Sequence, residues 1–237
     1  GDGDTSFCGN CRRNIPAGNV LAHSVSCYRN NFRCQECDEV MPLRDKESHA
    51  QLWTDPVKLL EATAQRDVET LTKMFGHGAD FSAVEHPETR ETVMHAAARL
   101  DDVPLIEYFM GFGVDVDPVS AAGETPLHLA AESCAPGGEA RSVKLLADLG
   151  AKLNLPNGRG ETALMLVCRR GVARAAQYLL EQRADAEAQT RLGDTPLQIA
   201  QRNGHQETVL ALCKAGAQLR PGTPSRARSG SPIPAPG

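Results

Sequence analysis

Seven cysteine and histidine residues near the start of the chain follow a repeated spacing that suits zinc binding. The two sets are Cys8-x2-Cys11-x11-His23-x3-Cys27 and Cys34-x2-Cys37-x11-His49. A structural zinc site takes four sulfur or nitrogen ligands in a tetrahedron, and a Cys-x-x-Cys turn supplies two of them as thiolates. His23 and Cys27 stand four positions apart, so on a helix they share one face. The first set therefore predicts a closed structural site of three thiolates and one imidazole.

The second set lacks an evident fourth ligand. Trp53 and Thr54 stand four and five positions after His49, where that ligand is expected, and neither side chain binds zinc. Asp55 carries a carboxylate, which is an acceptable zinc ligand. It also precedes Pro56 and an apolar segment, which is typical of a helix N-cap followed by proline in the first turn. We expect one or two zinc ions, and the sequence leaves the fourth ligand of the second site open.

The order of the ligands resembles that of tandem TRAF-type zinc fingers, in the form seen in XIAP-associated-factor-like innate-immunity adaptors. The resemblance covers residues 7–53 and includes the six-residue spacer between the fingers. It implies that the fingers are structural and serve protein contacts, with ubiquitin or innate-immune signalling components as partners by analogy. A RING domain would interleave its two sites, whereas here one finger is complete before the next begins. A disulfide framework is the other alternative, and we disfavour it because no secretory signal segment is visible.

A second motif recurs through the rest of the chain. Its copies place threonine at positions 92, 125, 162 and 195, at intervals of 33, 37 and 33 residues. The copy that starts at Gly123 reads Gly-Glu-Thr-Pro-Leu-His-Leu-Ala-Ala. A 33-residue period with this motif resembles the ankyrin repeat, in which each unit is a helix pair that must stack on its neighbours. The resemblance covers residues 54–219 and implies a mainly α solenoid of about five repeats, preceded by a small zinc-finger domain.

Details of the repeats can be predicted from their residues. Threonine should cap the first helix of each unit, with proline just inside it. The 37-residue interval has four extra residues, which should form a loop at 134–139 between two helices. The first unit lacks the Thr-Pro-Leu-His motif, so we expect it to be a terminal capping unit, with Trp53 packing the fingers against it. The five predicted units span approximately residues 55–83, 91–117, 124–154, 161–187 and 194–219.

Composition narrows the classes of function. The chain has 237 residues and a formal net charge of −5, and most of the excess acid falls in the repeats. An acidic solenoid argues against nucleic-acid binding, because that affinity rests on Lys and Arg against phosphates. The sequence contains no run of 18 apolar residues, so we expect no membrane span. Residues 1–6 are predicted to be an N-terminal extension, and residues 220–237 a disordered basic tail rich in Pro, Ser and Gly.

The repeats also carry cysteine and histidine, but in patterns that do not indicate catalysis. His95 and His128 occupy the histidine position of the ankyrin motif, where the imidazole is expected to bond backbone groups. We find no Ser-His-Asp set, Gly-rich phosphate loop or paired-carboxylate site, and we expect no enzyme. Cys134, Cys168 and Cys213 are predicted to be reduced thiols, which favours a cytoplasmic or nuclear protein.

We therefore expect an interaction adaptor that binds proteins through its fingers and through the concave face of the solenoid. Arginines gather near that face, and arginine binds carboxylates in bidentate geometry, so an acidic peptide is one predicted partner and a solvated surface is the alternative. A substrate-recruiting ubiquitin-ligase subunit and a nucleic-acid-binding finger protein are the alternative functions. The candidate partner-binding residues are Arg99, Arg159, Arg169, Arg170, Arg191 and Arg202.

Overall fold

The structure is a computed structural model, and it divides into two compact units, residues 1–87 and 88–237. No helix among the described residues is both long and apolar enough to cross a bilayer. The residues that the structure describes are 5–8, 13–16, 27, 31–34, 39–135 and 137–216.

The first unit begins with two short antiparallel hairpins that repeat each other. Strand β1 (Thr5–Phe7) pairs with β2 (Asn14–Pro16), and β3 (Asn31–Arg33) pairs with β4 (Val40–Pro42), each in the same register after a shift of 26 residues. The turns match as well, because the N–H of Cys8 donates to Arg13 O at 2.9 Å and that of Cys34 donates to Glu39 O at 2.8 Å. In the sequence, each Cys-x-x-Cys segment falls between the two strands of one hairpin.

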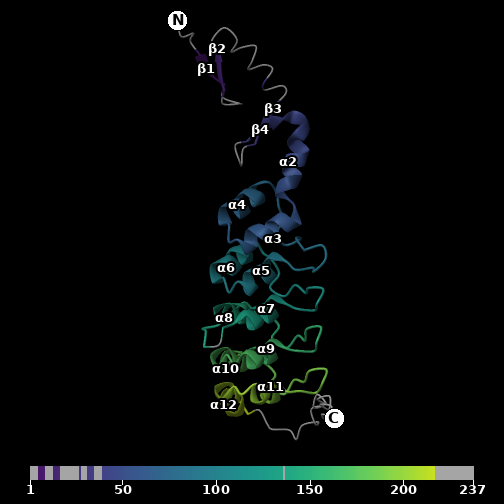
Figure 1. Ribbon diagram of the computed structural model, residues 1–237, viewed down its shortest axis with the longest axis vertical. Coiled ribbons are helices and arrows are strands. Elements are labelled where there is room, and N and C mark those ends of the chain that lie inside the picture. Colours follow the sequence, from purple (N-terminus) through teal and green to yellow (C-terminus); the bar gives the residue numbers. More distant parts are fainter. Residues whose placement is uncertain are drawn as a thin grey trace, which may run out of the picture. The chain divides into compact units, whose positions relative to one another are not determined.

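Three helices complete the first unit (Figure 1). A 3₁₀ turn, η2 (Leu43–Asp45), leads into α2 (Lys46–Trp53), followed by α3 (Pro56–Ala64) and α4 (Val68–Gly76). Asp55 begins α3 as predicted, since its carboxylate accepts a hydrogen bond from Val57 N at 2.9 Å and Pro56 occupies the first turn. Helices α3 and α4 pack together. Their buried side chains include Leu59, Leu71 and Met74, and Phe81 in the segment after α4 is also buried.

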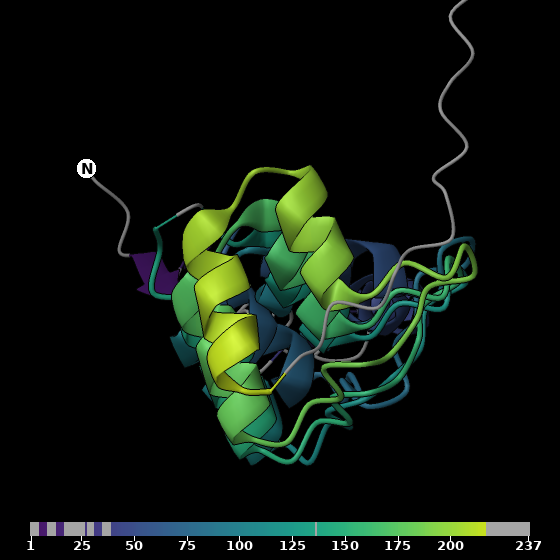
Figure 2. The ribbon, with the colours of Figure 1, turned by 90° about the horizontal axis from the view of Figure 1, so that it is seen from below.

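The second unit is a stack of four helix pairs in two parallel rows (Figures 1 and 2). The first helix of each pair packs on the first helix of the next, and the second helices do the same. We call these the first-helix row and the second-helix row. The first-helix row is α5 (Val93–Arg99), α7 (Pro126–Ser133), α9 (Ala163–Arg170) and α11 (Pro196–Arg202). The second-helix row is α6 (Val103–Gly111), α8 (Arg141–Asp148), α10 (Ala173–Glu181) and α12 (Gln206–Lys214).

A threonine begins each helix of the first-helix row, as the sequence predicts. Its backbone N–H donates to the side chain of the third helical residue, which closes a capping box. That third residue is His95, His128, Met165 or Gln198, and the donor–acceptor distances run from 2.9 to 3.4 Å. The box therefore survives where the histidine of the motif is replaced.

The core of the stack lies between the two rows. Phe109, Ile106, Leu146 and Leu179 of the second-helix row are completely shielded from solvent. Burying one such side chain stabilises the fold by roughly 1.5–3 kcal/mol, so the rows hold together through apolar contact. The predicted loop is present between α7 and α8, where Ala140 adopts a left-handed conformation with φ of 49° just before α8. The long loops that join one helix pair to the next extend from one side of the stack (Figure 2). They are residues 112–125, 149–162 and 182–195, and we call them the hairpin loops and this side the hairpin side.

Candidate functional site

The two motif histidines join neighbouring repeats through backbone groups. His128 Nδ1 accepts the N–H of Thr125 at 3.1 Å, while Nε2 lies 3.0 Å from Leu155 O and 3.2 Å from Glu161 O. His95 makes the equivalent bonds to Thr92 N and to Glu124 O. These partners require a neutral imidazole with its proton on Nε2. Both residues have the structural role predicted from the motif.

Burial lowers the pKa of His128 below its usual value of 6.5, although its backbone carbonyl partners oppose the shift. A lowered folded-state pKa means that the stabilising neutral form is fully present above pH 6.5 and is lost as the pH falls. Replacing His128 with glutamine should keep the capping box, because Gln198 closes the box of Thr195. It should also reduce this acid sensitivity. The free energy of urea unfolding, measured above and below pH 6.5 for the parent and for His128→Gln, tests this. If the variant loses as much stability on acidification as the parent does, the prediction is wrong.

A ladder of ion pairs follows the first-helix row. Arg99 pairs with Glu91, Arg169 Nη1 lies 2.7 Å from Glu161 Oε1, and Arg202 Nη1 lies 2.9 Å from Asp194 Oδ2. In every case the acid stands eight residues before the arginine, immediately ahead of the capping threonine. Each pair therefore ties the end of a first helix back to its own hairpin. Exposed ion pairs contribute only about 0–1 kcal/mol, so the exposed pairs of Arg99 and Arg202 order the surface more than they stabilise the fold.

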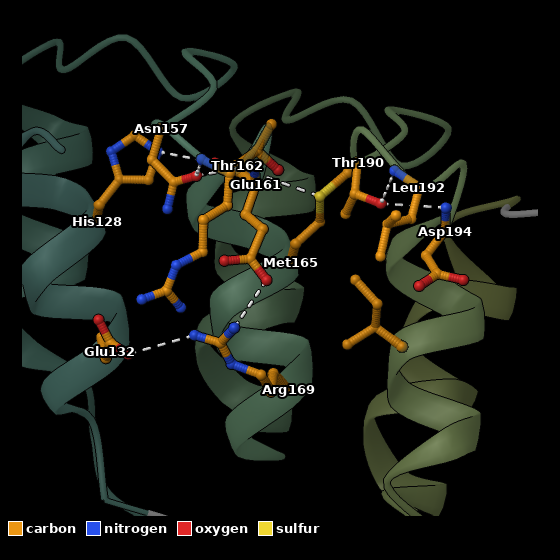
Figure 3. A network of polar contacts seen from close by, with 12 residues as sticks. His128, Glu132, Asn157, Glu161, Thr162, Met165, Arg169, Thr190, Leu192 and Asp194 are labelled. Carbon is orange, nitrogen blue, oxygen red and sulfur yellow. Dashed lines mark hydrogen bonds and ion pairs between the residues drawn. The ribbon is translucent and has the colours of Figure 1, made fainter. Parts of the chain in front are cut away.

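The repeat that contains α7 breaks this pattern, because its ion pair links it to the next repeat. Glu132 stands where the other units have arginine, and the acid eight residues earlier is Glu124. Burial raises the pKa of Glu124, and the charge of Glu132 raises it further. Arg159 and Arg99 lower that pKa, and Arg169 of the next unit pairs with Glu132, since its Nη2 lies 3.3 Å from Glu132 Oε1 (Figure 3). Arg169 thus bridges carboxylates of two neighbouring repeats.

The six candidate arginines divide into two groups. Arg99, Arg169 and Arg202 are held in the ladder, whereas Arg159, Arg170 and Arg191 are exposed and form no ion pair with any described residue. Arg170 Nε donates to Cys134 O at 3.3 Å. Of the ladder arginines, Arg99 also lines a shallow groove of about 240 Å³. Its lining residues are Arg99, Leu129, Glu132 and Ser133.

The hairpin arginines Arg159 and Arg191 belong to neighbouring loops. A Cβ on Gly160 would lie only 2.8 Å from Arg191 Cγ, so the Arg191 side chain crosses the loop that carries Arg159. Arg191 therefore lies against the residue that follows Arg159, on the hairpin side of the stack.

His205 is a structural residue that the motif analysis missed. Its Nε2 lies 3.1 Å from Arg169 O, so the ring covers the C-terminal end of α9 from the next repeat. The ring also lies against Gly171, where a Cβ would come within 2.4 Å of His205 Nδ1. The glycine at position 171, which ends α9, is the feature of the sequence that could have indicated this contact. The contacting residues are at least 34 positions apart, however, and no local motif joins them.

The described part of the predicted zinc fingers contains three of the seven ligands. Cys8, Cys27 and Cys34 are at most 3% exposed, and none of the described cysteines forms a disulfide. Cys8 and Cys34 directly follow the first strand of each hairpin, and buried thiols there suit zinc thiolates. Cys11, His23, Cys37 and the imidazole of His49 lie outside the described residues. Within the described residues no three His, Cys, Asp or Glu side chains converge on one point.

The repeat cysteines Cys134 and Cys168 are buried, and burial raises the pKa of their thiols to about 11 and about 12. Cys213 is exposed on α12. At those pKa values the two buried thiols are protonated at neutral pH and are poor nucleophiles. Both side chains pack in the core.

These features define a helical repeat scaffold, and the comparisons give its family. The family described as ankyrin repeats (3 copies) matches residues 59–157 and 134–221. The chain therefore belongs to the ankyrin-repeat family, and the match begins inside α3, so it includes the first helix pair. Ankyrin repeats are protein–protein interaction scaffolds, and members of the family are typically not enzymes.

Individual relatives match parts of the chain. Human ankyrin repeat domain-containing protein 63 is 40% identical over 104 residues, which is 44% of this chain and 27% of that protein. A Caenorhabditis elegans homolog of transient receptor potential cation channel subfamily A member 1 is 32% identical over 131 residues, 55% of this chain and 10% of its own length. Human TRAF-type zinc finger domain-containing protein 1 is 40% identical over 48 residues, 20% of this chain and 8% of its own length. The chain thus spans about a quarter or less of these relatives.

Proposed function

We propose that this chain is a zinc-stabilised adaptor that binds protein partners through the hairpin side of its ankyrin stack. The observation that carries the proposal is the division of the arginines. The ladder neutralises Arg99, Arg169 and Arg202 against the protein's own carboxylates, and leaves Arg159 and Arg191 exposed on the hairpin side, with Arg170 exposed at the C-terminal end of α9. Guanidinium groups bind carboxylates in bidentate geometry, so an acidic peptide segment is the partner that suits this surface.

The proposed zinc fingers would form a second contact module. Residues 7–53 would bind zinc through Cys8, Cys11, His23 and Cys27 in the first finger and through Cys34, Cys37 and His49 in the second. The buried thiols and the partial likeness to a TRAF-type zinc finger protein support this. Zinc would supply the folding free energy that such short hairpins lack.

The double variant Arg159→Glu with Arg191→Glu should weaken binding of the partner by roughly 2 kcal/mol, as loss of interface hot spots does. Partners captured by the parent chain from a cell extract would be identified and their affinity for both proteins measured. Arg169 is unsuitable for this test, because a glutamate there would face Glu132 and Glu161 and disturb the fold.

Arg174→Glu with Lys214→Glu is the matched control. It makes the same change in charge on the second-helix row, where Arg174 and Lys214 are exposed. Partner affinity should match that of the parent, and the melting temperature of both double variants should barely move. Equal weakening by the two double variants would show that only net charge matters, and the hairpin surface would then not be the binding site.

A further inference from the structure

An imidazole lies against one of the predicted zinc ligands. His77 Nε2 is 3.3 Å and Nδ1 is 4.0 Å from Cys34 Sγ, although the two residues are 43 positions apart. Cys34 is 2% exposed, and both residues belong to the first unit. In a tetrahedral zinc site, bonds of about 2.3 Å to sulfur and about 2.0–2.1 Å to nitrogen place the two ligand atoms about 3.6 Å apart. The observed contact is within a few tenths of an ångström of that separation.

The imidazole also lies where the second finger lacks a ligand. The 26-residue shift that superimposes the two hairpins carries Cys27, the last ligand of the first finger, onto Trp53. The Trp53 ring stacks on the His77 ring with centroids 5.0 Å apart and planes 8° from parallel. Position 49 is one turn before position 53 on α2, so both positions share a face of that helix. Position 49, the predicted ligand position, therefore lies on the face of α2 that carries Trp53, the residue that stacks on His77.

Asp55, the other candidate for the fourth ligand, has a different role. Its carboxylate accepts the N–H of Val57 and begins α3. The repeat does not fix the residue type at position 77, because the same position at the end of the second helix is Phe112, Leu149, Gln182 or Ala215 in the other pairs. The fold therefore does not require histidine there.

We infer that His77 Nε2 is the fourth ligand of the second zinc site, completing a closed set of two thiolates and two imidazoles with Cys34, Cys37 and His49. This inference rests on the proposed zinc fingers. A ligand supplied from the end of α4 makes the zinc ion a cross-link between the second finger and the first ankyrin helix pair. The finger and that pair would then fold as one metal-dependent module rather than as two linked domains.

The test uses the full chain and two metals. Zinc affinity is measured by chelator competition, and cobalt substitution reports the ligand set through its absorption bands. His77→Gln copies the residue at position 182. It should lower the affinity for one of the two zinc ions by at least about tenfold, since even loss of a residue that only supports a ligand costs 10–100-fold in metal affinity. His77→Cys should retain both ions and strengthen the sulfur-to-cobalt absorption, because a third thiolate enters the site.

Trp53 gives a separate readout, because it is the only tryptophan in the chain. Cobalt bound beside the stacked rings should quench its fluorescence in the parent, and His77→Gln should require more cobalt to do so. The controls are His86→Gln, a histidine elsewhere in the first unit, and Asp55→Asn, which keeps a good N-cap but removes the carboxylate. Both should bind zinc as the parent does.

Two results would overturn the inference, and they differ from each other. If His77→Gln keeps two zinc ions at parental affinity, or if Asp55→Asn shows the loss instead, the Cys34–His77 contact is only a hydrogen bond and the fingers remain. If the parent chain, purified under reducing conditions, takes up no zinc, the zinc fingers themselves are absent and the proposed function loses its metal. Partner binding through the hairpin arginines is measured separately and does not depend on either result.

Discussion

Replacing Cys11 with serine should remove one zinc ion from the chain and unfold residues 7–30, while the ankyrin stack keeps its helical signal. A short hairpin has too little apolar surface to fold alone, so in such modules the free energy of metal binding is the free energy of folding. In zinc-finger peptides that apparent free energy is about 10–16 kcal/mol at neutral pH, which makes this the largest effect expected from a single substitution here. Metal analysis of the purified protein and amide hydrogen exchange measure the two parts of the prediction.

Cys213→Ser is the matched control for Cys11→Ser, since Cys213 is an exposed cysteine on α12, far along the sequence from the fingers. It should leave the zinc content and the exchange pattern of residues 7–30 unchanged. A folded, reduced Cys11→Ser protein with the parental zinc content would show that Cys11 is not a ligand. Loss of helical signal from the stack would show instead that the fingers and all the repeats fold together.

The parts of the fold that sequence predicts well are those fixed by neighbouring residues. Thr92, Thr125, Thr162 and Thr195 begin helices because the bonds of a capping box join residues only three positions apart. Asp55 and Pro56 start α3 for the same local reason. The role of His128 also follows from the motif, and the repeat period places its carbonyl partners in the next unit.

The parts that sequence leaves open depend on contacts across the stack or within the first unit. Arg169 was predicted to face a partner, but the structure adds Glu161 from its own hairpin and Glu132 from the preceding unit. The acid precedes the capping threonine and the arginine ends the helix, so the two lie on different elements and no single amphipathic period joins them. His77 lies 43 positions from Cys34, and only the folded helix pair reveals that the two side chains meet.

Gly171→Ala should destabilise the stack by roughly 2–5 kcal/mol. Gly171 ends α9 with φ of 76°, and a left-handed conformation costs a residue with a Cβ about 1–2 kcal/mol. The new Cβ would also lie 2.4 Å from His205 Nδ1. Overpacking of that kind typically costs a further 1–3 kcal/mol, because the ring must leave the carbonyl of Arg169 that it bonds at 3.1 Å.

Gly204→Ala separates the two contributions to this loss. Gly204 has the same φ of 76° in the next repeat, but a Cβ there would meet nothing within 4 Å. It should therefore show only the conformational cost, and the difference in free energy of unfolding between the two variants measures the packing of His205. Adding His205→Ala to Gly171→Ala should recover the overpacking part, since it makes room for the Cβ. If Gly171→Ala and Gly204→Ala are equally stable, the His205 ring moves aside freely, and its bond to Arg169 O contributes little to joining the two repeats.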